Sequence, residues 1–353
     1  MPSSIDLREY QTPIRNQSRR TCTTFCSIAA LEAAYKRAGY GDTDLSEGFF
    51  IYMIKTFWLD NWSRVERRGA EGRETQIGFG SGGNGPESLE LLASGLKIPN
   101  EAVWPFRSRN FTERDHPWIA NPYNSPFWQT QEKVSEFNLA EGFLERSHTL
   151  AGEYYSAEGF NLINKDDGFI DQLETVLAMG HEVVLDFGIN YTIENPDDES
   201  ARLWRSNGPG GESHCVLLVG FNRESRDPDE HYFIAKNSWG KESRTARSDG
   251  FTYLSYDVLR VNAHRAGYIT GVTEPEPWPE LGFVGRWDLV KGNWNGRIDI
   301  YHIPGIMQSV LNKRSGSERL TDRRIGTFYG CDGAVLRVNG SIYNRTIDLY
   351  IQI

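Results

Sequence analysis

Cys22 is the residue of this chain whose type and position best suit covalent chemistry. It stands where a polar loop gives way to an apolar helix pattern, since Phe25, Ile28 and Leu31 repeat at the spacing of one buried helix face. A thiol at a helix N-terminus lies at the positive end of the helix dipole, which favours the thiolate and makes it a nucleophile. Without other evidence, however, a cysteine at the head of an apolar helix is more often a buried core residue.

A thiolate that attacks a carbonyl needs a histidine to hold its proton and a group that orients this histidine. His214 follows a glycine-rich loop and begins an apolar strand pattern, so its ring can face an open cleft. Asn237 follows a second strand pattern that could pair with the first. An asparagine oxygen that accepts from the histidine N–H fixes the tautomer, and the neighbouring Trp239 can shield this hydrogen bond from water. These residues together predict thiol chemistry.

The elements that must position these residues separate into a helical first part and a strand-rich second part. Helices are expected at 22–38, 48–58, 86–95, 129–144 and 169–179. Strands are expected at 182–187, 215–221, 232–235 and 251–255. Apart from its one helix, the region 104–164 is irregular and stays without an expected structure. The pattern favours an α+β fold with two lobes.

A proline- and acid-rich segment, 273–280, is expected to be a linker because it can form neither a helix nor a central strand. After it, residues 281–353 alternate in short stretches punctuated by Gly and Asn, which predicts a small antiparallel barrel or sandwich. The apolar positions expected to face its interior are Trp287, Leu289, Ile298 and Ile300. The Gly285-Arg-Trp287 stretch is similar to the opening of calycin-type barrels.

Composition excludes several classes of protein. The chain has 353 residues and a net charge of -10, which disfavours a nucleic-acid partner. No apolar run approaches the roughly 20 residues that span a bilayer, and the N-terminus lacks a signal-peptide pattern. Four dispersed cysteines do not predict a disulfide framework, so reduced thiols and a cytoplasmic location are expected. The histidines lack ligand-like spacing, and neither a metal nor a cofactor is expected.

The sequence resembles the papain-like cysteine peptidases. The resemblance extends over roughly residues 4 to 270, with Gln, Cys, His and Asn in the family's chain order. The stretches that carry it are Asn16-Gln17, Thr21-Cys22-Thr-Thr-Phe-Cys-Ser, Ser213-His214-Cys-Val, Lys236-Asn237-Ser-Trp239-Gly, Pro13-Ile-Arg-Asn-Gln, Leu45-Ser-Glu47, Gly82-Gly83, Trp104-Pro-Phe106 and Asp249-Gly-Phe-Thr-Tyr253. It implies a papain-like domain over 1–272, with an N-terminal helical lobe and a C-terminal β-barrel-like lobe.

The resemblance also implies roles for the candidate catalytic residues. Cys22 is expected to be the nucleophile, and His214 the general base and then acid. Asn237 is expected to orient the histidine. Gln17, together with the backbone N–H of Cys22, is expected to stabilise the oxyanion.

Five further residues are expected to contact the substrate: Gly82, Gly83, Val184, Cys215 and Trp239. The glycines match those whose backbone pairs with an extended peptide. Val184 and Cys215 match positions that line the pocket for the residue before the cleaved one, which would make this pocket mid-sized and apolar.

The sequence also departs from the family. The loop from Gln17 to Cys22 is one residue shorter than usual, which displaces the oxyanion donor by part of a turn. Arg19 and Arg20 stand where the family has a disulfide-forming cysteine and a glycine. No inhibitory propeptide is expected before the domain.

Three functions remain open. The first is a cysteine endopeptidase that hydrolyses peptide or isopeptide bonds in a peptide or protein substrate through a thioester. The second is an acyltransferase or amidase that uses the same thioester. The third is a catalytically silent scaffold for a ligand-binding β-domain. The C-terminal domain itself is open to ligand binding, to carrying the enzyme to a partner protein, or to capping the cleft.

Overall fold

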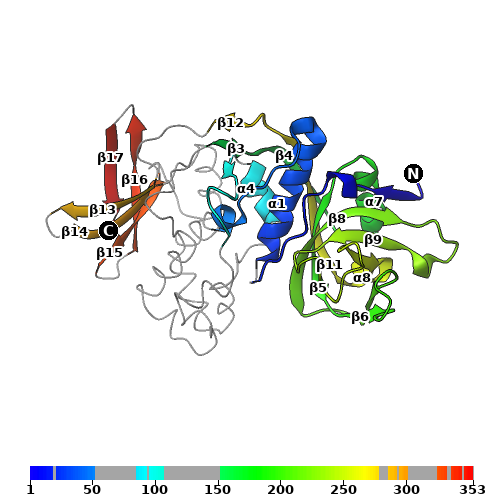
Figure 1. Ribbon diagram of the computed structural model, residues 1–353. Helices are drawn as coiled ribbons and strands as arrows, with labels where there is room; N and C mark the ends of the chain where they lie inside the picture. Colours follow the sequence, from blue (N-terminus) through cyan, green and yellow to red (C-terminus); the bar gives the residue numbers. More distant parts are fainter. Residues whose placement is uncertain are drawn as a thin grey trace. The chain divides into compact units, whose positions relative to one another are not determined.

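The computed structural model describes residues 1–18, 21–51, 85–93, 95–106, 152–277, 285–291, 294–300, 324–331, 335–343 and 346–352. They form a mixed α and β protein with one large sheet and few helices (Figure 1). The chain divides into two compact units. One comprises Met1–Leu45, Gly83–Ala93 and Ser156–Glu274, and the other Ser46–Gly82, Ser94–Tyr155 and Pro275–Ile353. The division after Glu274 falls inside the predicted linker, whereas the predicted first domain is shared between both units.

Nine strands of the described residues form the large sheet of the first unit. They are β1 (Ser4–Asp6), β4 (Ala157–Ile163), β5 (Val183–Ile189), β6 (Tyr191–Glu194), β7 (Leu203–Ser206), β8 (Glu212–Asn222), β9 (Tyr232–Lys236), β10 (Thr252–Ser255) and β11 (Ala263–Val272). The spatial order is β4-β11-β5-β8-β9-β10-β7-β6, and β1 pairs with β8 beside this path. Neighbours are antiparallel except β7 and β10.

Four helices of the first unit flank this sheet: α1 (Cys22–Tyr35), α4 (Gly85–Ala93), α7 (Phe169–Ala178) and α8 (Tyr256–Asn262). Alternation along β5 separates its two faces. Val183, Leu185 and Phe187 join a buried cluster with apolar side chains of α7 and α8. Val184 and Asp186 instead face the first residue of α4. The face of β5 and β8 that meets α1 and α4 is therefore the one next to Cys22.

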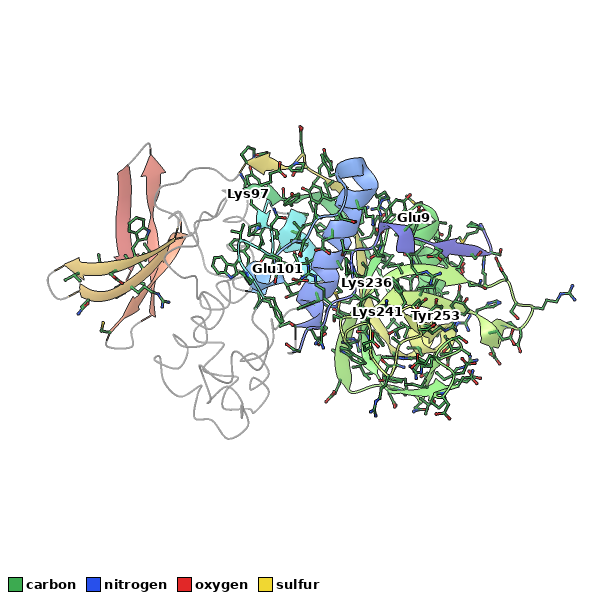
Figure 2. The ribbon with its side chains drawn as sticks, in the orientation of Figure 1. Glu9, Lys97, Glu101, Lys236, Lys241 and Tyr253 are labelled. Atoms are coloured by element: carbon green, nitrogen blue, oxygen red, sulfur yellow. A yellow bond between two sulfur atoms is a disulfide. The ribbon has the colours of Figure 1, made fainter. Side chains whose placement is uncertain are left out.

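A buried polar chain ties α1 to β9. Lys236, which is labelled in Figure 2, is the last residue of β9. Its Nζ donates to Thr12 Oγ1 over 2.8 Å. The Thr12 hydroxyl in turn donates to the carboxylate of Glu32 in α1. The other oxygen of Glu32 accepts from the Leu45 backbone N–H at 2.9 Å. This chain links the helix that begins at Cys22 to the strand that leads into Asn237.

The second unit contains two smaller sheets. In the first, β12 (Glu276–Pro277), β3 (Glu153–Tyr155) and β2 (Ile98–Pro99) are neighbours in that order. The predicted linker thus contributes an edge strand, where proline is tolerated. The second is an antiparallel sheet in the order β13 (Gly285–Lys291), β14 (Trp294–Ile300), β15 (Arg324–Gly330), β16 (Val335–Tyr343) and β17 (Thr346–Gln352).

The C-terminal strands lie where the alternating pattern predicts them. Trp287 pairs in register with Ile298, which places both side chains on one face as expected, but 43% of Trp287 is exposed whereas Ile298 is 2% exposed. Leu289 is half-buried. The burial of Ile300 is outside the description. Among the described residues the five strands form an open meander, so closure into a barrel stays a prediction.

Candidate active site

Cys22 is the first residue of α1, with Thr21 at the N-cap position. Its side chain is half-buried. The backbone of Cys215 is near enough to the Cys22 thiol to lower its pKa. Because Cys215 directly follows His214 in β8, the thiol lies near the part of the strand that carries the histidine.

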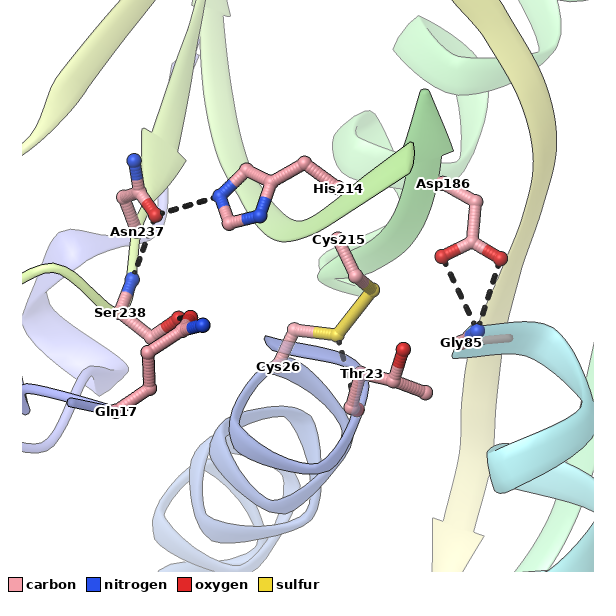
Figure 3. Close-up of a disulfide and its surroundings, with 9 residues drawn as sticks. All are labelled: Gln17, Thr23, Cys26, Gly85, Asp186, His214, Cys215, Asn237 and Ser238. Atoms are coloured by element: carbon pink, nitrogen blue, oxygen red, sulfur yellow. Dashed lines mark hydrogen bonds between the residues drawn. A yellow bond between two sulfur atoms is a disulfide. The ribbon is translucent and has the colours of Figure 1, made fainter. Parts of the chain in front are cut away.

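His214 and Asn237 meet as predicted. His214 Nε2 lies 2.9 Å from Asn237 Oδ1, and the two residues are only 4% and 5% exposed (Figure 3). Since an amide oxygen can only accept, Nε2 carries the hydrogen and Nδ1 keeps its lone pair. The Trp239 ring stacks on the imidazole with a centroid distance of 4.6 Å. Trp239 therefore shields the histidine, while its predicted contact with substrate stays a prediction.

Gln17 is held against the segment that follows Asn237. Its backbone N–H donates to Ser238 O at 2.8 Å, and its side-chain Oε1 accepts from the Ser238 hydroxyl at 2.6 Å. Asn16 and Trp239 form a β-bridge beside these contacts. Residues 19–20 of the shortened loop lie outside the described residues, but Gln17 itself is anchored by Ser238. This role of Ser238 was not predicted from the sequence, although its place directly after Asn237 indicated that it lies at the site.

Burial determines the charge of both reactive groups. It raises the pKa of the Cys22 thiol above its ordinary value, and the negative Asp186 raises it further. Burial also lowers the pKa of His214 to about 4, although its hydrogen bond to Asn237 acts in the opposite direction. Both groups are therefore neutral near pH 7. Burial thus acts against the thiolate that the helix position was expected to favour.

The two predicted pocket residues lie close together but are covered. Val184 and Cys215 are 0% and 1% exposed. Gly85, the first residue of α4, lies directly on them, since a Cβ there would be 2.5 Å from Val184 Cγ1 and 2.8 Å from Cys215 Sγ. Within the described residues these side chains do not line an open pocket. Gly82 and Gly83, the other predicted substrate contacts, lie outside the described residues.

Asp186 belongs to the site although sequence reasoning missed it. Its two carboxylate oxygens accept from the Gly85 backbone N–H at 3.1 and 2.9 Å (Figure 3). The residue pairs in register with Cys215 and is 8% exposed. A carboxylate inside the apolar run of β5 was the available signal, because a buried charge needs a partner. It anchors α4 beside Cys22.

The prediction that all four cysteines are reduced is wrong. Cys26 in α1 and Cys215 in β8 form a disulfide, whereas Cys22 and Cys331 are free thiols. The pairing depends on how α1 packs on β8, which the sequence spacing does not reveal. The cytoplasmic location was expected because all four cysteines were expected to be reduced, and the disulfide removes this argument.

The described residues contain no group of three or more His, Cys, Asp or Glu side chains arranged to hold a metal ion. No helix among them is long and apolar enough to cross a membrane. Neither the known protein-family models nor the curated proteins include a match to this chain. The geometry around Cys22 is therefore the basis for assigning a function.

Proposed function

We propose that this protein is a papain-like cysteine endopeptidase that hydrolyses peptide or isopeptide bonds through a thioester on Cys22. The observation that carries the proposal is the buried hydrogen bond between His214 and Asn237, on the strands next to the helix that begins at Cys22. A nucleophile, a base and a group that orients the base form the minimal set for this chemistry. The mixed sheet with α1 packed against it is compatible with a papain-like two-lobed fold.

In the proposed reaction the thiol and the imidazole both begin neutral. His214 takes the S–H proton on Nδ1 as the Cys22 sulfur bonds to the substrate carbonyl carbon and the carbonyl π electrons move to oxygen. When this oxyanion collapses, the C–N bond breaks and His214 gives the proton to the leaving amine. Water then attacks the thioester with His214 as base, which releases the acid and restores the Cys22 thiol.

Gln17 supplies the oxyanion donor in this scheme. The Ser238 hydroxyl holds the oxygen end of the Gln17 amide, so the Nε2 end is the one presented for donation. The backbone N–H of Cys22, at the head of α1, is the second donor. Loss of one such donor typically costs about 10²- to 10³-fold in kcat.

The test is covalent labelling with a peptidyl epoxide that alkylates activated cysteines. We expect stoichiometric labelling of Cys22 in the native protein and none at this site in Cys22→Ala. His214→Ala should be labelled at least about 100-fold more slowly, because the thiol loses its base. The matched control is Cys331→Ala, which removes the other free thiol and should leave the labelling rate unchanged.

Equal labelling rates for native protein and His214→Ala would contradict the proposal. A fluorogenic peptide library then separates hydrolysis from acyl transfer. In water alone the peptidase releases free acid, and added amine changes the products only if the thioester is passed to it.

A further inference from the structure

A covalent bond joins the two elements that carry the proposed nucleophile and base. Cys26 lies one helical turn after Cys22 in α1, and Cys215 directly follows His214 in β8. Their disulfide spans 189 residues of sequence (Figure 3). It therefore connects a neighbour of the nucleophile to a neighbour of the base.

The disulfide lies where two helices pack against a pair of strands. Cys26 and Cys215 are 3% and 1% exposed. Gly85 of α4 covers the Cys215 sulfur, and Asp186 on β5 holds Gly85 in place. Helix α1, helix α4 and the strand pair β5 and β8 thus meet at the disulfide, where interiors are close-packed and transmit displacements.

Cys215 contacts the reactive group by a second route. Its side chain is bonded to the Cys22 helix, and its backbone is near enough to the Cys22 thiol to lower the pKa of that thiol. A shift of Cys215 away from α1 would therefore move His214 relative to Cys22. A misplacement of about 1 Å can cost about a hundredfold in rate.

Building on the proposed function, we propose that Cys26 and Cys215 are positioning residues. Their disulfide holds Cys22 where His214 can take its proton, and neither sulfur takes part in bond making with the substrate. The site thus combines one cysteine that must stay reduced with two that must be oxidised.

The test measures how strongly His214 assists Cys22 with and without the disulfide. The rate of Cys22 labelling by the peptidyl epoxide is compared between native protein and His214→Ala. The same comparison is made in a background carrying Cys26→Ser and Cys215→Ser. The ratio of rates, about 100 or more in the native background, should fall at least about tenfold without the disulfide. On a fluorogenic peptide, kcat should fall while KM changes by less than about threefold.

A second background, Cys26→Val with Cys215→Ala, separates the covalent bond from packing, since it keeps apolar volume without a bond. Circular dichroism and urea unfolding identify conditions in which every variant is folded. A ratio that stays as large in both backgrounds as in native protein overturns the positioning role alone. A native ratio near one overturns the proposed function and this inference with it. Free Cys26 and Cys215 thiols in a peptide map of the native protein would also overturn the inference.

Discussion

Burial shifts the pKa values of His214 and Cys22 in opposite directions. Burial lowers the pKa of His214 to about 4 and raises that of Cys22. Near pH 7 the proton thus stays on sulfur. In the proposed reaction, general-base transfer during attack therefore suits this site better than a preformed ion pair.

The first prediction concerns stability and follows from the pKa of His214. Its pKa is 6.5 when unperturbed and about 4 in the folded protein. Between these values the unfolded chain takes up a proton that the folded protein does not, so the free energy of unfolding falls as pH decreases through this window. The fall approaches about 3 kcal/mol. Above pH 6.5 this group adds no pH dependence.

Urea unfolding of native protein and His214→Gln at pH 7.0 and pH 4.5 tests this prediction. Glutamine stays neutral at both pH values, so the stability lost on acidification should be smaller in the variant by about 2 kcal/mol. The same loss in both proteins would mean that His214 titrates normally in the fold. His231→Gln is the matched control, because His231 is half-buried and its Nε2–H donates to Ser225 O at 2.9 Å.

The second prediction concerns the group that orients the histidine. Asn237→Ala removes the acceptor for His214 Nε2–H and leaves the ring without a fixed tautomer. We expect the labelling rate of Cys22 to fall about 10- to 100-fold, in the range set by other positioning partners. Thr252→Val is the control. The Thr252 hydroxyl accepts a long hydrogen bond of 3.5 Å from Asn237 Nδ2, so its loss leaves the bond between Asn237 Oδ1 and His214 in place. A native rate in Asn237→Ala would contradict the orienting role.

At this scale, sequence reasoning could predict His214 and Asn237 because residue type and chain order carry their chemistry. It could not predict the pairing of Cys26 with Cys215, since those residues are brought together only by the packing of α1 on β8. Asp186 was missed for the same reason, because its partner is a backbone N–H on α4.

At the scale of elements, the helices and strands with the clearest apolar patterns were confirmed. Several other strands of the sheet were not predicted. Helix α1 begins at the expected Cys22 and ends at Tyr35, and a π-helical segment over Lys36–Tyr40 follows it, with positive φ at Gly39 and Gly41. Helices α4 and α7 and strands β5, β8, β9 and β10 also lie where expected. Strands β4 and β11 were missed because their partners come from distant sequence. Strands β6 and β7, which pair with each other, were missed as well. The expected helix 129–144 and residues 52–58 of the helix 48–58 lie outside the described residues.

The third prediction concerns the polar chain between α1 and β9. Thr12→Val removes the hydroxyl that accepts from Lys236 and donates to Glu32, and leaves two buried charged groups without this partner. We expect a loss of about 2 to 3 kcal/mol in the free energy of unfolding, because unsatisfied buried polar groups are costly. Urea unfolding measures it. Thr12→Ser keeps the hydroxyl and should lose less than about 1 kcal/mol. Equal losses in both variants would contradict the role of the hydroxyl, since only Thr12→Val removes it.

At the scale of the whole molecule, the described residues of the site all belong to the first unit. Gln17, Cys22, Asp186, His214 and Asn237 lie within Met1–Leu45 and Ser156–Glu274. The five strands β13 to β17 belong to the second unit. A chain that ends before these strands can therefore test whether the proposed chemistry needs the C-terminal sheet.

The last prediction is that a chain ending at residue 280 keeps the reactive thiol. This truncation retains β12, whose pairing with β3 would be lost in a chain ending at 274. We expect Cys22 in the truncated chain to be labelled within about threefold of the native rate. His214→Ala should slow this labelling by the same factor as in the full chain, because Cys22 and His214 both lie in the first unit. Unfolding curves and labelling rates of both chains are measured together. A truncated chain that is folded but no longer shows a His214-dependent rate would mean that the C-terminal sheet acts on catalysis. Unchanged labelling with altered turnover of protein substrates, but not of short peptides, would instead assign this sheet to substrate selection.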